Sequence, residues 1–204
     1  MFVGLADTFA QVGFMHLGAI CLVVVFAAVM RAFTGFGFAL TAVPVFSLFM
    51  IPTQAVVLSA LLGLAVNLFT VKTYWGKYPL KPLLPMIGFA VVGTVLGTAL
   101  LASVSSQAFQ LSIGVSVIAA SLVLTFYRPD HKEAGLALNS LTGLASGCLN
   151  GAFAIPGPPV IIFAMATQPD PQRSRALLMT FFLFSAIAAV LSYSVAGFVT
   201  ASTG

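Results

Sequence analysis

The chain has 204 residues, of which 60% are hydrophobic and 6% are charged, and its mean hydropathy is +1.13. A soluble domain carries about 25% charged residues, so this composition predicts an integral membrane protein. The eight basic and four acidic residues are too few and too scattered for a nucleic-acid-binding patch, which excludes nucleic-acid partners. Abundant Gly and Phe suit helices packed closely in lipid better than a β-barrel. We therefore predict one all-α transmembrane domain over residues 1–204.

Charges and prolines divide the apolar sequence into predicted helices, because about 20 residues are needed to cross the hydrocarbon core. In chain order these helices cover residues 14–33, 38–51, 53–71, 82–101, 107–127, 134–149, 158–167 and 172–200. Two of them, 38–51 and 158–167, are too short to span the bilayer comfortably. We expect each of these two to return the chain across, or partly across, the bilayer.

The basic residues predict the orientation of the bundle, since Lys and Arg concentrate in cytoplasmic loops. An external N-terminus puts all of them on the cytoplasmic side: Arg31, Lys72, Lys77, Lys81, Arg128, Lys132, Arg173 and Arg175. Residues 1–11 hold Asp7 and no Lys or Arg, so no cleavable signal peptide is predicted. The sequence therefore predicts a multi-pass protein of the plasma membrane with its N-terminus outside.

Two glycine- and proline-rich stretches indicate an internal repeat. Aligning Phe38 with Phe153 also aligns Pro44 with Pro159, an offset of 115 in each case (153 − 38 and 159 − 44). The shared pattern is a long helix, a break, a short helix and another long helix. Five predicted helices precede the second copy, and an odd number inverts it. We predict a first repeat over residues 14–127 and an incomplete, inverted second repeat over residues 134–200.

The predicted breaks, Thr34–Gly37 and Asn150–Gly157, are the candidate binding site. Unwound backbone at membrane depth needs cover from protein or a wet cavity, and the helix start that follows it favours an anion. Pro158 and Pro159 supply no N–H, which leaves the N–H groups of Gly157, Val160 and Ile161 as donors. The competing interpretation of the glycines is close helix packing.

The polar residues within the helices leave several alternatives open. Arg31 either assists an anion or extends to the cytoplasmic headgroups. Asn67 and Asn139 are expected to form hydrogen bonds between helices. No acidic residue lies within a predicted span, so a carboxylate proton relay is not expected. Without clustered His, Cys or carboxylates, no metal site, other cofactor or catalytic residue is predicted.

Two cysteines raise one further class of function, a membrane thiol-disulfide carrier. The predicted repeat argues against it, because the offset of 115 pairs Cys148 with Phe33 and not with Cys21. We expect both cysteines to be buried packing residues, and their replacement by Ser to have little effect.

The residues of the two breaks resemble the paired signatures of the sulfite exporter TauE/SafE family. The first is Thr34-Gly35-Phe36-Gly37 with Pro44 and Pro52 after it, and the second runs from Ser146-Gly147 through Asn150-Gly151 to Gly157-Pro158-Pro159. Arg175 with Ala176 also fits the family pattern. The resemblance implies a bacterial inner-membrane permease that exports sulfite, sulfonates or related small organic anions. It also implies that the two clusters line the substrate site.

Together these arguments predict an anion exporter that works by alternating access at a midplane site, in contact with lipid and a small anionic substrate. The predicted substrate-binding residues are Arg31, Thr34, Gly35, Phe36, Gly37, Pro44, Asn150, Gly151, Gly157, Pro158 and Pro159. An anion pore of the channel type would use the same donors without alternation. The incomplete second repeat leaves open either a truncated chain or a short member that completes its wall as a homodimer.

Overall fold

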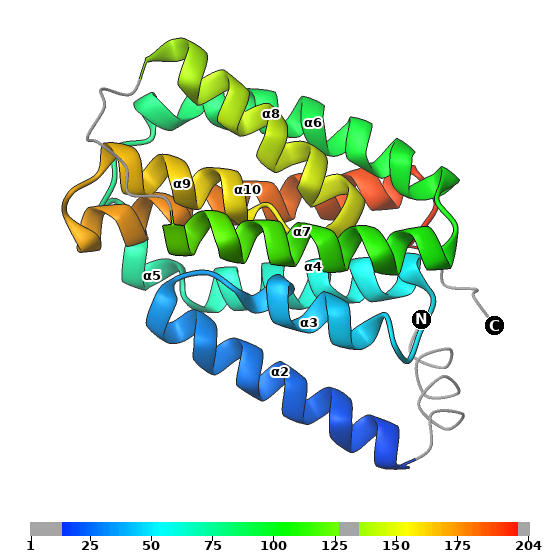
Figure 1. Ribbon diagram of the computed structural model, residues 1–204. Helices are drawn as coiled ribbons and strands as arrows, with labels where there is room; N and C mark the ends of the chain where they lie inside the picture. The colour runs from blue at the N-terminus through cyan, green and yellow to red at the C-terminus, as the bar shows by residue number, and fades with distance from the viewer. Residues whose placement is uncertain (1–13, 127–134, 200–204) are drawn as a thin grey trace.

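The computed structural model describes residues 14–126 and 135–199, and in these ranges the chain forms helices and no strand. The long helices lie side by side as a bundle (Figure 1). They are α2 (Phe14–Thr34), α3 (Phe38–Phe46), α4 (Pro52–Phe69), α5 (Val71–Tyr74), the 3-10 turn η1 (Lys81–Leu83), α6 (Leu84–Ser103), α7 (Ser106–Phe126), α8 (Leu136–Phe153), α9 (Gly157–Thr167) and α10 (Pro171–Val195). The all-α prediction is confirmed.

Three helices of the described chain are long and apolar enough to cross a membrane: Pro52–Phe69, Lys81–Ser103 and Pro171–Val195. The last of these, α10, is the most buried and packs against α4, α6, α8 and α9. It begins at a proline, and the Asp170 side chain caps it by accepting a hydrogen bond from the backbone N–H of Gln172 at 3.0 Å. The bundle is therefore built around a central helix with a well-defined start.

Each predicted helix corresponds to an observed one, with corrections at some ends. Helix α3 ends at Phe46 rather than at residue 51, and the next helix begins at Pro52. A proline disfavours helical backbone in the residue before it, and Ile51 is accordingly extended. Helix α8 continues to Phe153, beyond the predicted end at residue 149. Helix α10 ends at Val195, so the predicted continuation to residue 200 is wrong; Gly197 has a left-handed φ of 76° just after the helix end. The predicted boundaries at residues 127 and 134, and the segment 1–13, lie outside the described residues.

Two sets of three helices correspond to each other at a constant spacing. The ends of α2 and α8, the starts of α3 and α9 and the starts of α4 and α10 are each 119 residues apart (153 − 34, 157 − 38 and 171 − 52). The predicted offset of 115 would match the start of α3 with the end of α8, so that alignment is wrong by about one helical turn. Followed by colour in Figure 1, each helix of one set runs opposite to its counterpart in the other.

Helices α6 and α8 pack with their backbones in contact. The glycines of this interface follow one face of each helix at four-residue spacing: Gly93, Gly97, Gly143, Gly147 and Gly151. A Cβ atom added at any of them would lie 2.0 to 2.4 Å from a carbonyl oxygen of the facing helix. Small residues permit such approach between membrane helices. For these glycines, close packing is therefore the interpretation that the structure supports.

Candidate functional site

The first break connects α2 to α3 through three residues, Gly35 to Gly37. Gly35 and Gly37 have φ of +81° and +97°, which side chains other than glycine's rarely adopt. The N–H of Gly35 still donates to Arg31 O at 2.8 Å, and the Gly37 carbonyl accepts from Thr41 N at 3.1 Å. The two glycines thus reverse the chain sharply between the end of one helix and the start of the next.

The second break is shorter than the sequence predicts. It covers Ala154 to Pro156, whereas the predicted stretch began at Asn150, which lies in the last turn of α8. Ala154 has a φ of 54°, and its N–H donates to Asn150 O at 2.7 Å. These bonds extend α8 by one turn, because a left-handed residue just after a helix lets the last carbonyls be paired.

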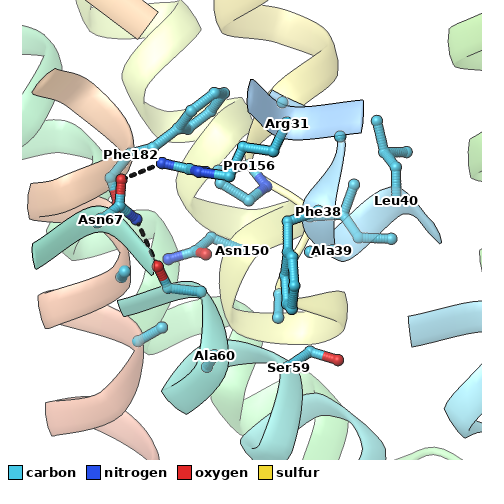
Figure 2. Close-up of a pocket in the computed structure, with 17 residues that line it drawn as sticks. Arg31, Phe38, Ala39, Leu40, Ser59, Ala60, Asn67, Asn150, Pro156 and Phe182 are labelled. Carbon is cyan, nitrogen blue, oxygen red and sulfur yellow. Dashed lines mark hydrogen bonds between the residues drawn. The ribbon is translucent and has the colours of Figure 1, made fainter. Parts of the chain in front are cut away.

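A cavity of about 60 Å³ lies between the two breaks and helices α4 and α10 (Figure 2). About 15 Å³ holds one water, so this volume suits about four waters or one small ion. The lining residues are Arg31, Gly37, Phe38, Ala39, Leu40, Ser59, Ala60, Gly63, Asn67, Asn150, Ala154, Ile155, Pro156, Gly157, Phe182, Ala186 and Ala189. The cavity therefore draws on both sets of helices.

The starts of the two short helices border this cavity. Residues 37–40 of α3 and residues 156–157 of α9 line it, and neither helix has a side-chain cap at its start. The first N–H groups of a helix lack partners within that helix and carry the positive end of its dipole. Two uncapped helix starts at one cavity create an environment that favours an anion.

Arg31 brings a full positive charge to the same place. It is 5% exposed, and its Nη2 donates to Asn67 Oδ1 (Figure 2), whereas its Nε finds no acceptor among the described residues. The Asn67 amide donates in turn to Gly63 O at 2.9 Å and to Phe182 O on α10 at 3.4 Å. The guanidinium thus lies inside the bundle, fixed by an amide that links α4 to α10.

Asn150 occupies the position of Arg31 in the other set, 119 residues later. Its Nδ2 donates to Ser185 O on α10 at 2.8 Å and to Thr94 Oγ1 on α6 at 3.2 Å. The Tyr193 hydroxyl lies 2.7 Å from Asn150 O and 3.0 Å from Gly151 O and donates to this end of α8. Tyr74, the counterpart of Tyr193 at the same spacing, donates to Asn67 O at 2.9 Å. Both sets therefore contain a buried tyrosine that donates to a backbone carbonyl, on α4 in the first set and at the end of α8 in the second.

The structure brings four of the predicted binding residues to the cavity: Arg31, Gly37, Asn150 and Gly157. Six others lie outside the lining. Gly35 packs against Arg175, Phe36 packs against the core, and Gly151 packs against α6. The three prolines lie within the short helices, Pro44 in α3 and Pro158 and Pro159 in α9. Thr34 ends α2, and its side chain lies outside the described part.

Sequence reasoning missed part of the lining. Asn67 was expected mainly to link helices, with a contact to substrate as the less favoured alternative. Its bond to Phe182 O confirms the link between helices, and it also accepts a hydrogen bond from Arg31. Ser59, whose buried Oγ has no partner among the described residues, gave no signal in the sequence. Asn139 is buried on α8, where its Oδ1 has no partner in the described chain.

Both cysteines are free. Cys21 is exposed, so the expectation that it is buried is wrong, because α2 lies at the edge of the bundle (Figure 1). Cys148 is partly buried on α8. Among the described residues, no group of His, Cys, Asp and Glu could hold a metal ion.

A bundle of apolar helices around a buried cationic cavity defines a membrane protein suited to binding an anion. The model of the sulfite exporter TauE/SafE family matches residues 20–204, and the chain belongs to this family. The resemblance seen in the sequence is confirmed. Members of the family are membrane transporters of sulfite and related anions rather than enzymes. Neither the curated proteins nor the solved structures contain a significant match.

Proposed function

We propose that the chain exports sulfite, sulfonates or related small oxyanions across the bacterial inner membrane, and that the cavity between the two breaks is the binding site. The observation that carries this proposal is the buried Arg31, whose Nε has no acceptor among the described residues, beside two uncapped helix starts. A pyramidal oxyanion offers several acceptor oxygens for such donors. A guanidinium matches them with donors in a fixed planar arrangement.

The amides and backbone around Arg31 would orient the anion. Asn67 holds the guanidinium through its Oδ1, and the N–H groups at the start of α3 supply uncharged donors. Gly157 at the start of α9 leaves room for close approach, because it has no side chain. No acidic residue of the described chain lines the cavity, which favours an anion over a cation.

Transport would follow from the relation between the two sets of helices. Sets of opposite direction around a shared site are typical of carriers that expose the site alternately to each face. In Figure 1, the end of α2, helix α5, the start of α6 and the start of α10 lie at one end of the bundle. Lys72 lies on α5, Lys77 and Lys81 lie between α5 and α6, and Arg173 and Arg175 lie at the start of α10. We assign this end to the cytoplasm, and the N-terminus to the outside, from this charge distribution.

The test is uptake of radiolabelled sulfite into liposomes that contain the purified full chain and are preloaded with unlabelled sulfite. Wild-type protein should give saturable uptake that unlabelled sulfite competes away. Arg31→Gln should lower uptake at subsaturating sulfite by about 10- to 100-fold, because a hydrogen bond to a charged group contributes about 1.5–3 kcal/mol. The matched control is Arg173→Gln, which removes an exposed arginine at the start of α10 and should keep normal uptake.

Two results would contradict the proposal. Equal uptake by wild type and Arg31→Gln would remove the cavity from the transport path. Unsaturable sulfite conductance in electrical recordings would instead indicate the pore alternative, which uses the same donors without alternation.

A further inference from the structure

The charge of Arg31 has no carboxylate partner in the described chain. Asp170 is the only acidic residue there, and its carboxylate accepts from Gln172 N at the start of α10. The observed partner of the guanidinium, Asn67, is a neutral amide. Since arginine stays protonated in proteins, nothing described in the protein neutralises this charge when the cavity is empty.

The cost of this charge depends on whether water reaches the cavity. When the cavity is open to one face of the membrane, water solvates the guanidinium. When the cavity closes before opening to the other face, the unpaired charge is left in a medium of low dielectric constant, which is strongly unfavourable. A bound anion removes that cost, because it forms an ion pair with Arg31.

We propose that this protein is an obligatory anion exchanger, in which the cavity changes sides only with a small anion bound. The inference rests on the proposed function and extends it to the return step. Export of one oxyanion is then coupled to import of another small anion. Because the cavity measures about 60 Å³, we expect the returning anion to be small, such as chloride, bicarbonate or sulfite, and gluconate to be a poor substrate.

The experiment measures release of radiolabelled sulfite from liposomes that contain the full-length protein. Potassium and valinomycin hold the membrane potential at zero, so that charge build-up does not limit release. The outside solution contains either gluconate alone or gluconate with unlabelled sulfite or chloride. Release should be at least about ten-fold faster with a small anion outside, because crossing with an unpaired buried charge is so unfavourable.

Asn67→Asp is the sharpest variant, since it places a carboxylate of the same shape against the Arg31 guanidinium. The new ion pair neutralises the empty cavity. Release into gluconate should therefore rise above the wild-type rate, while release into sulfite slows because Arg31 is less available to the anion, so the ratio of the two rates falls toward one. Arg173→Gln should keep the wild-type ratio. A fluorescence size-exclusion profile checks that each variant is folded.

The release experiment distinguishes failure of obligatory exchange from failure of the export function. Protein-dependent release at equal rates in gluconate and in sulfite would overturn obligatory exchange and leave the export function standing. A wild-type ratio in folded Asn67→Asp would also overturn it. Label retained under every condition would overturn the export function and, with it, the exchange.

Discussion

Helices α2 and α8 are counterparts, yet the bundle holds them in different ways. Helix α8 lies with its backbone against α6, where three of its glycines leave no room for a Cβ atom. Helix α2 lies at the edge of the bundle and packs mainly against the short helix α3. The last turn of α8 carries Asn150 in bonds to α6 and α10, whereas that of α2 carries Arg31 with an unpartnered Nε.

The breaks after α2 and α8 therefore differ in how firmly they are held and in which of them carries a charged side chain. The α8 break is bonded to its neighbours and serves as the fixed wall of the cavity. The α2 break has glycines at two left-handed positions and supplies the charge. The two sets of helices therefore share the backbone path through their breaks, while the buried charge lies in one set and the firmly bonded break in the other.

The largest effect is expected from a substitution in the interface between α6 and α8. In Gly151→Ala the new Cβ would lie 2.0 Å from Thr94 O, so α6 and α8 must separate. We expect a loss of about 3 kcal/mol or more of stability, at the upper end of the range for overpacking. The measurement is thermal unfolding in detergent. The control is Gly114→Ala on α7, where nothing lies within 4 Å and stability should hold or rise slightly. Similar behaviour of both variants would refute the rigid interface.

Removing the hydroxyl of Tyr193 or of its counterpart Tyr74 should have a smaller effect on stability. Tyr193→Phe removes the donor to the carbonyl pair at the end of α8 and should cost about 2 kcal/mol. Tyr74→Phe should cost about 1 kcal/mol, because Thr70 Oγ1 also approaches Asn67 O, at 3.4 Å. Unfolding midpoints in the same detergent would compare them. A larger loss in Tyr74→Phe would contradict the expectation that the end of α8 is held more firmly than its counterpart.

The left-handed positions should respond in opposite directions. Gly35→Ala forces a Cβ into a left-handed residue beside Arg175 and should cost about 1–2 kcal/mol. Ala154→Gly relieves the strain of φ 54° at the counterpart and should stabilise the protein by up to about 1 kcal/mol. Thermal unfolding measures both changes. Destabilisation by Ala154→Gly would show that this alanine is not strained.

The cysteines should give the smallest effect. Cys21→Ser changes an exposed side chain on α2, and Cys148→Ser a partly buried one on α8. Each should alter stability by no more than about 0.5 kcal/mol, as for substitutions away from special features, and leave sulfite uptake unchanged. Abolished transport in both variants would instead support the thiol carrier.

Much of the fold was predictable because hydrophobic length and proline position are local signals. Pro52 and Pro171 begin their helices within one residue of the predicted starts. The end of α8 was not predictable in the same way, because Asn150 and Gly151 suit a break as well as a helix. Their helical state depends on α6, which accepts Gly151 at its backbone and bonds Asn150 through Thr94.

The sequence predicted those residues of the candidate site that have a local signal. Arg31 is a charge in an apolar helix, and Gly37 and Gly157 lie at helix breaks. It was not predictable where only distant contacts define it. Asn67 reaches the cavity because it contacts Arg31 on α2 and Phe182 on α10. A single amide in an apolar helix does not indicate, from the sequence alone, which helices it will contact. Matching Phe38 with Phe153 failed for a related reason, since apolar residues recur often enough in such a chain to align by chance.

The shortness of α3 and α9 has an electrical consequence. Their 9 and 11 residues correspond to about 14 and 17 Å, which together equal the hydrocarbon thickness of about 30 Å. An anion held where both helices begin would therefore sit about halfway through the membrane field. At 100 mV, each half of its path would carry about 1 kcal/mol per unit charge, half of the full drop. An interior-negative cell would thus drive net export electrically, while a one-for-one swap of equal charges would be insensitive to that voltage.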